Sequence, residues 1–176
     1  VVDNVDAANT VLAAGETYVA INYIKNIEDG ETITLPRAAE YYLQIPAVDA
    51  KLNIVGDEAT KVYITLVEDN SAVNGIELNI DTPSATVTVS KVGNSKVKKI
   101  TSKTAPNTLI LEGIVVGDIV VNGGNVILDN STVETVTKSG SNTDTTTEVV
   151  LSNGSEITGE VSDNITKTDV SKIDTA

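Results

Sequence analysis

From about residue 17 onward, this chain consists of short runs in which apolar and polar residues alternate, each bounded by Gly, Asn, Asp, Pro or Ser. Examples are KVYITL, ATVTVS, DIVV and NVIL. Val, Ile and Thr together supply 65 of the 176 residues, and these β-branched side chains fit pleated strands better than helices. The sequence therefore predicts an all-β chain made of many short strands.

The core of such a chain must be built from small branched side chains. Phe, Trp and Met are absent, so 25 Val, 17 Ile, 10 Leu, the Ala residues and a few Tyr have to fill it. These side chains suit thin, repetitive layers. They suit an immunoglobulin-like sandwich poorly, because that fold usually centres on a Trp.

Two arrangements of the strands are open. Asn-Gly pairs at residues 74–75, 122–123 and 153–154 are typical of β-hairpins. However, strands as short as DIVV and NVIL make weak hairpins, and bends such as NGG and DNS separate them. Stacked coils of roughly twenty to thirty residues explain both features better. The sequence predicts a single-stranded right-handed parallel β-helix, a β-solenoid, with an N-terminal capping α-helix.

The segment 115–140 shows how the coils would be built. Its apolar residues are expected to point inward from successive strands: Val116, Ile119, Val121, Val126, Leu128, Val133 and Val136. Residues that tolerate a left-handed backbone are expected at the corners: Gly117, Asn122, Gly123, Gly124 and Asn130.

The capping helix is predicted over residues 5–14, with Asp3 or Asn4 as N-cap and Gly15 just beyond its end. The length suits one domain over residues 1–176. Within it we expect a helical cap at 1–16, β-helix coils at 17–162, and a C-terminal cap or tail at 163–176.

Composition excludes several classes of function. Without Cys or His, the chain has no disulfide, no Cys-ligated metal and no serine–histidine or cysteine–histidine catalysis. A net charge of −13 disfavours nucleic acids and anionic membranes. The apolar runs are too short to cross a bilayer, so no membrane insertion is expected. The chain lacks an initiator Met and is expected to be a mature segment whose targeting sequence lies elsewhere.

Residues 107–136, NTLILEGIVVGDIVVNGGNVILDNSTVETV, resemble the β-helical part of secreted or lipid-anchored surface proteins of Bacteroidetes. These are described as cell-adhesion or pectate-lyase-like proteins. The segments ANTVLAAGETYVAI, ETITLP and YYLQIP look like that group's helical cap and first coils. The resemblance implies an extracellular location at a bacterial surface, as an outer-membrane lipoprotein, and a role in adhesion or structural display.

The alternative is a domain that binds or processes polysaccharides, by analogy with lyases and hydrolases of this fold. Lyases of this type use clustered carboxylates with an Arg or Lys base, and the hydrolases a close set of Asp residues. Here the one arginine is Arg37, and adjacent acids occur only at 28–29, 57–58 and 68–69, in expected turns. We therefore predict no enzymatic activity, no bound metal and no cofactor.

Five tyrosines, Tyr18, Tyr23, Tyr41, Tyr42 and Tyr63, all fall in the first 63 residues. They either fill the first coils or present rings to a sugar or a protein partner. Tyr41 and Tyr42 point to opposite faces if they share a strand, so one is expected in the core and the other outside.

A basic band interrupts the acidic chain, because no acid occurs between Asp81 and Glu112. It contains Lys91, Lys96, Lys98, Lys99 and Lys103. The band meets an anionic glycan, balances acids of neighbouring coils, or keeps an exposed sheet edge soluble. Lys96, Lys98 and Lys99, with Tyr41 and Tyr42, are the candidate ligand or partner surface.

The polar segment 139–148 is expected to protrude as a loop, and Thr145 within it is a candidate O-glycosylation site of the short Asp-Ser/Thr type. The expected partner is a surface glycan or a protein. The chain is expected to act as a monomer or weak oligomer, with adhesion or structural display as its function.

Overall fold

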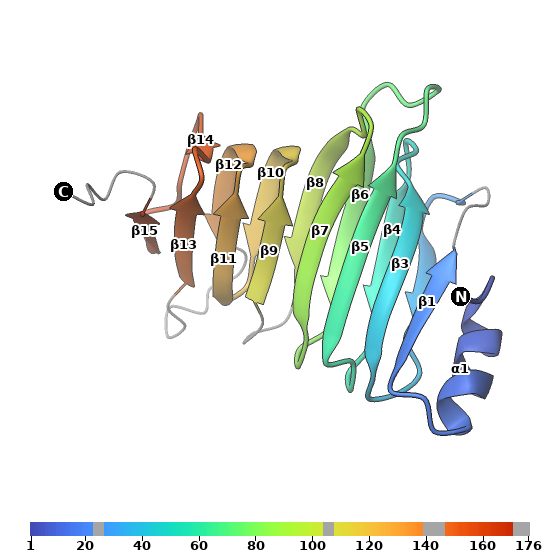
Figure 1. Cartoon of the computed structure of the whole chain (residues 1–176). Coiled ribbons are helices and arrows are strands. Elements are labelled where there is room, and N and C mark those ends of the chain that lie inside the picture. The colour runs from blue at the N-terminus through green and yellow to red at the C-terminus, as the bar shows by residue number, and fades with distance from the viewer. Residues whose placement is uncertain (23–26, 104–107, 139–146, 171–176) are drawn as a thin grey trace.

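The alternating runs form two parallel β-sheets that face each other along the whole length of the computed structural model (Figure 1). The structure describes residues 1–22, 27–103, 108–138 and 147–170. After each strand the chain crosses to the other sheet, so odd-numbered strands form sheet A and even-numbered strands form sheet B. Every strand pairing in both sheets is parallel, which excludes the hairpin arrangement.

Sheet A has eight strands: β1 (Tyr18–Asn22), β3 (Glu40–Pro46), β5 (Lys61–Val67), β7 (Thr86–Val92), β9 (Thr108–Glu112), β11 (Gly124–Asp129), β13 (Thr147–Ser152) and β15 (Ile165–Asp169). Sheet B has seven strands: β2 (Glu31–Thr34), β4 (Lys51–Val55), β6 (Ile76–Asp81), β8 (Val97–Ser102), β10 (Val115–Val121), β12 (Thr132–Lys138) and β14 (Glu156–Ile157).

One coil is one strand of each sheet plus two bends. The shortest coil spacing is 17 residues, from Val116 to its register partner Val133. The longest is 26 residues, from Leu52 to its register partner Leu78. The predicted parallel β-solenoid is therefore confirmed, with two sheets and coils close to the expected length.

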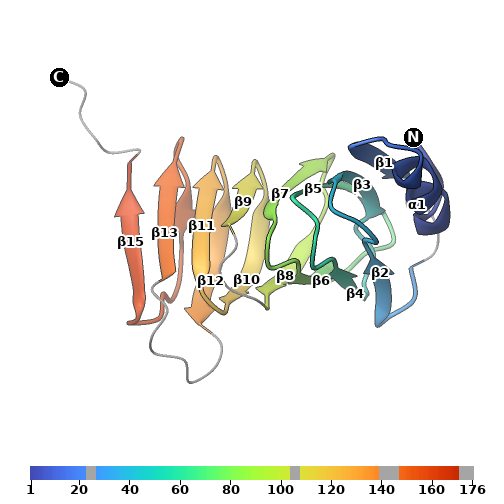
Figure 2. The same ribbon diagram turned by 90° about the horizontal axis from the view of Figure 1, so that it is seen from below.

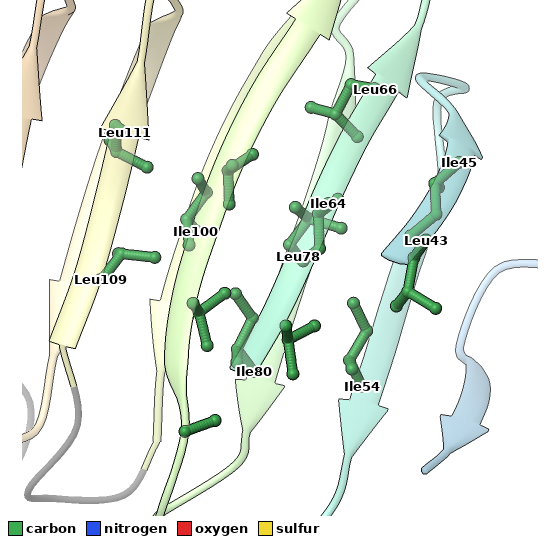
Figure 3. Close-up of a cluster of buried hydrophobic side chains, with 14 of the residues drawn as sticks. Leu43, Ile45, Ile54, Ile64, Leu66, Leu78, Ile80, Ile100, Leu109 and Leu111 are labelled. Carbon is green, nitrogen blue, oxygen red and sulfur yellow. The ribbon is translucent and has the colours of Figure 1, made fainter. Parts of the chain in front are cut away.

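The core is a continuous stack of aliphatic side chains between the two sheets. Figure 3 shows residues of β3, β5 and β9 meeting those of β4, β6 and β8 in this space. All seven residues predicted to point inward from segment 115–140 have at most 1% of their surface exposed. Stacking in register lets each buried residue contact its equivalents in the coils above and below, so small side chains suffice to fill the core.

The helix α1 (Val5–Ala13) lies against the first coil, where it covers one end of the stack (Figure 2). The side chain of Asn4 accepts a hydrogen bond of 2.8 Å from the backbone N–H of Ala7, which identifies Asn4 as the N-cap. Ala8 and Leu12 belong to the hydrophobic core. The predicted N-terminal helix is thus confirmed.

The corner prediction was right for four residues and wrong for one. Gly123 and Asn130 have positive φ angles at bends, and Asn122 lies at the same bend as Gly123. Gly124 also has a positive φ angle, where this bend enters β11 as the first residue of the strand. Gly117 is instead an interior residue of β10. A Cβ atom there would lie 2.6 Å from the carbonyl oxygen of Lys98, so close backbone contact is what requires glycine.

The coils extend beyond the expected boundary at residue 162. Ile165–Asp169 form β15, which pairs in parallel with β13 along its whole length. This segment is a further strand of sheet A, rather than a separate cap or tail. Ile165 is the one buried residue of this strand, and the others are threonines and charged residues. The sequence of the strand therefore shows no alternation of apolar and polar residues.

Candidate functional site

The outer face of sheet A carries one row of apolar and aromatic side chains between two polar rows. In-register pairing aligns eight residues along the middle of the face, here called the central row: Ala20, Tyr42, Tyr63, Thr88, Ile110, Ile127, Val150 and Thr168. Of these, Thr88 is buried, Tyr42 is 40% exposed and the rest are half-buried.

The neighbouring rows are polar. One of these rows begins with the exposed Tyr18 and continues with Glu40, Lys61, Thr86, Thr108, Asn125 and Glu148. The other contains Asn22, Gln44, Thr65 and Ser90. Lys61 Nζ is 3.3 Å from Glu40 Oε1. An apolar strip with polar margins makes the outer face of sheet A the candidate binding surface.

Tyr42 and Tyr63 stack on one another in the central row. Their ring centroids are 4.7 Å apart and the rings are nearly parallel, with an interplanar angle of 8°. The separation matches the spacing of neighbouring strands, because the two residues are register partners in β3 and β5. Partial desolvation, followed by the nearby carboxylate of Glu40, raises the pKa of the Tyr42 hydroxyl.

Tyr41 does not belong to this surface, although it was expected there with Tyr42. Its side chain points into the core and is 0% exposed. Its hydroxyl donates a hydrogen bond of 2.8 Å to the carbonyl oxygen of Arg37 and accepts one of 3.0 Å from the Arg37 N–H. Burial raises the pKa of the Tyr41 hydroxyl. The expectation that Tyr41 and Tyr42 point to opposite faces is confirmed.

A hollow of about 250 Å³ adjoins the stacked pair at the N-terminal end of sheet A. Tyr42, Gln44 and Thr65 line it from β3 and β5. Ala20 and Asn22 of β1 line it as well, together with Val1. The hollow exists because the register partner of Tyr42 in β1 is the small residue Ala20.

Lys98 and Lys99 of the basic band lie on β8 of sheet B, with Lys96 just before that strand and Lys103 just after it. Lys91 lies on β7 of sheet A. Lys98 Nζ is 2.7 Å from Glu77 Oε1 of the preceding coil, and this contact lowers the pKa of Glu77 and raises that of Lys98. Lys99 stands in register between Glu77 and Asp118. Lys96 Nζ donates to the carbonyl oxygens of Ala72 and Val73, at 3.3 and 3.4 Å.

Opposite charges therefore alternate from coil to coil across sheet B. This arrangement favours the balancing role over an anionic ligand, because the nitrogen atoms of Lys96 and Lys98 contact carbonyl or carboxylate oxygens and Lys99 lies in register between two acids.

Two of the acids expected in turns, Asp29 and Asp69, accept hydrogen bonds from backbone amides. Asp29 accepts a hydrogen bond of 2.8 Å from the backbone N–H of Lys51, and Asp69 accepts bonds from the hydroxyl and N–H of Ser71. These bonds, that of the Ser71 hydroxyl first, lower the pKa of Asp69. Over the described ranges, no group of three or more acidic side chains is arranged to hold a metal ion.

Arg37 is held at the helical end of the solenoid. Its Nε donates a hydrogen bond of 2.7 Å to Oδ1 of Asn9 in α1. It therefore ties the helix to the segment before β3. Thr145 lies outside the described residues, as do Tyr23 and most of the polar segment 139–148. In the part of the chain that the structure covers, no helix has the length and apolar character needed to cross a bilayer.

The chain matches no protein-family model, no curated protein and no solved structure.

Proposed function

We propose that this chain is a non-catalytic adhesion module, displayed outside a bacterial cell, that binds a surface glycan or protein through the outer face of sheet A. The central row carries the proposal, because it places stacked tyrosines and half-buried aliphatic side chains along a flat surface with polar margins. Removal of such an apolar strip from water by a bound partner is favourable in free energy.

The solenoid supports adhesion mechanically. Each strand is hydrogen-bonded to the next coil, and the core continues through the whole stack. The face is therefore held rigid, so little conformational entropy is lost when a partner binds. The resemblance to Bacteroidetes surface proteins favours the same role, with a lipid anchor as the expected attachment and a monomer or weak oligomer as the working form.

The engagement of the charged residues supports a non-catalytic role. Asp29 and Asp69 accept hydrogen bonds from backbone amides, and Arg37 donates one to Asn9 of the helix. None of these side chains is poised beside another as an acid and base pair would be. Incubation of the chain with polygalacturonate should therefore release no reducing or unsaturated ends, and their release would contradict this part of the proposal.

Adhesion can be measured with fluorescent beads that carry the chain. The beads are washed over immobilised bacterial, plant and animal glycans and over mucin, collagen and fibronectin. We expect retention on at least one of these surfaces. Retention on none would overturn the proposal, and antibody labelling of intact producing cells tests the location separately.

Two substitutions test which face binds. Ile127→Lys places a charge in the central row of sheet A, and Val120→Lys places one at a half-buried outward position of sheet B. We expect Ile127→Lys to abolish bead retention and Val120→Lys to leave it unchanged. Equal effects of both substitutions would contradict binding through sheet A.

A further inference from the structure

The stack of Tyr42 and Tyr63 is not continued by an aromatic ring on β1. Strand β3 lies between β1 and β5 in sheet A, so Tyr63 covers the ring face of Tyr42 that points toward β5. The other ring face points toward β1, where the register partner is Ala20. The short Ala20 side chain cannot cover a ring, and the hollow of about 250 Å³ lies at this place. The hollow and this free ring face of Tyr42 are together called the Tyr42 slot.

The slot combines one aromatic face with neutral polar groups. The side chains of Asn22, Gln44 and Thr65 line it, and none of its lining side chains is charged. Oδ1 of Asn22 is buried, and within the described part of the chain no group donates a hydrogen bond to it. Because this oxygen is closed to solvent, the polar contacts open to a ligand come from the rest of the Asn22 amide and from the side chains of Gln44 and Thr65.

We propose that the Tyr42 slot binds one neutral pyranose ring, stacked on the free face of Tyr42 with its hydroxyl groups bonded to Asn22, Gln44 and Thr65. This inference rests on the proposed function, since it names the ligand class for one end of the same face. A sugar ring has an apolar face of C–H groups and a polar edge of hydroxyl groups, which matches the aromatic wall and the amide side chains.

Size and charge restrict the ligand further. A volume of about 250 Å³ is smaller than a typical pocket for a drug-sized ligand, so it suits a single ring of a longer chain. A net charge of −13 disfavours uronic acids and sulfated sugars, because the whole molecule repels anions. A neutral hexose unit of an oligosaccharide meets both conditions.

The test is a titration of the intact chain with cellotetraose, mannotetraose and N-acetylchitotetraose, followed by NMR of the side-chain amides of Asn22 and Gln44. Tetragalacturonate serves as the anionic comparison. We expect at least one neutral tetrasaccharide to shift both amide signals, with weaker binding of tetragalacturonate. Absence of shifts with all three neutral sugars, or tighter binding of tetragalacturonate, would overturn the proposal.

Variants separate the slot from the rest of the surface. Ala20→Leu fills the slot and leaves the Tyr42–Tyr63 pair in place, so we expect a loss of affinity of roughly tenfold or more, as for removal of a stacking contact. Tyr42→Ala should have the same effect, and Tyr42→Phe should keep most of the affinity. Tyr18→Ala is the matched control, since Tyr18 is 61% exposed on the same face of β1 and does not line the slot. Unchanged affinity in Ala20→Leu would refute the slot.

Failure of the slot and failure of the adhesion role give different results. If the tetrasaccharides do not bind while bead retention still depends on Ile127, the slot is wrong and adhesion through sheet A stands. If they bind in the slot while the beads are retained nowhere, the slot stands and the adhesion role is wrong.

Discussion

Asp49 and Gly75 meet across 26 positions of the chain, where Oδ1 of Asp49 accepts a hydrogen bond of 2.6 Å from the backbone N–H of Gly75. The same carboxylate accepts bonds of 2.8 Å from the N–H groups of Val73 and Asn74. Three successive amides thus converge on one acid of the preceding coil. A Cβ atom at Gly75 would lie 2.5 Å from the carbonyl oxygen of Lys96, so this approach also requires glycine.

These bonds, led by those of Val73 and Gly75, lower the pKa of Asp49. Because the folded pKa lies below the unfolded value of about 3.9, the carboxylate stabilises the fold above that pH. This contribution is lost as the pH falls through the lowered pKa. Hydrogen exchange at Val73, Asn74 and Gly75, compared at matched intrinsic rates, should therefore report loss of protection below about pH 3.9.

Replacement of Asp49 tests this directly. Asp49→Ala should expose the three amides to faster exchange at neutral pH and remove the acid-dependent change. Asp57→Ala, at an exposed acid of another turn, should alter neither. If exchange at Gly75 is the same in Asp49→Ala as in the unmodified chain, the carboxylate does not hold this bend.

Gly117 gives a second prediction from close backbone contact. A Cβ atom at this position would meet the carbonyl oxygen of Lys98 at 2.6 Å, and a backbone atom cannot rotate away. Gly117→Ala should lower the free energy of unfolding by about 1–3 kcal/mol, as overpacked sites do. Val115→Ala, at a 60% exposed position of the same strand, is the control for urea unfolding. Equal stability of Gly117→Ala and the unmodified chain would contradict the contact.

The sequence predicts the core better than the binding face. Inward residues such as Val116 and Leu128 repeat in every coil, and β-branched runs between turn residues define the strands whatever their register. The register of the strands is harder to predict, because it depends on the number of residues in each coil. This number varies, since the bends differ in length. Alignment of YYLQI with KVYITL at the 21-residue spacing of Leu43 and Ile64 would have placed Tyr42 beside Tyr63.

Other features carry no local signal. Capture of three amides by Asp49 joins residues that are 24 to 26 positions apart, and nothing around Asp49 distinguishes it from other turn acids. The sequence predicts a corner at Gly117, because glycine serves equally for a left-handed bend and for close approach of two strands. In β8, the inward residues Val97 and Ile100 are separated by two outward ones, Lys98 and Lys99, where strict alternation expects one.

Neighbouring aliphatic residues on opposite faces should differ in their contribution to stability. Leu128 is 0% exposed in the core, whereas Ile127 is half-buried on the outer face of the same strand. Leu128→Ala should lower the free energy of unfolding by about 2–5 kcal/mol. Ile127→Ala should cost less than about 1 kcal/mol. Urea denaturation measures both, and similar losses would mean that Ile127 is also a core residue.

The ion pair between Glu77 and Lys98 gives a prediction about charge. The hydrogen bond from Lys98 is the main reason for the lowered pKa of Glu77, and Lys51 and Lys99 add to it. Lys98→Gln should therefore raise the pKa of Glu77 toward its ordinary value without restoring it fully. The pair stabilises the fold above the unfolded Glu pKa of about 4.3, and this contribution disappears as the pH falls through the lowered value.

Carbon-13 NMR titration of the Glu77 carboxylate measures this shift. Lys167→Gln is the control, because Lys167 lies at the far end of sheet A, on β15. Raised salt should weaken the effect of Lys98, since both partners are partly exposed and mobile ions screen them. A pKa of Glu77 that is unchanged in Lys98→Gln would show that the lysines of sheet B do not balance the acids of the neighbouring coils, and would return Lys98 to consideration as a ligand-binding residue.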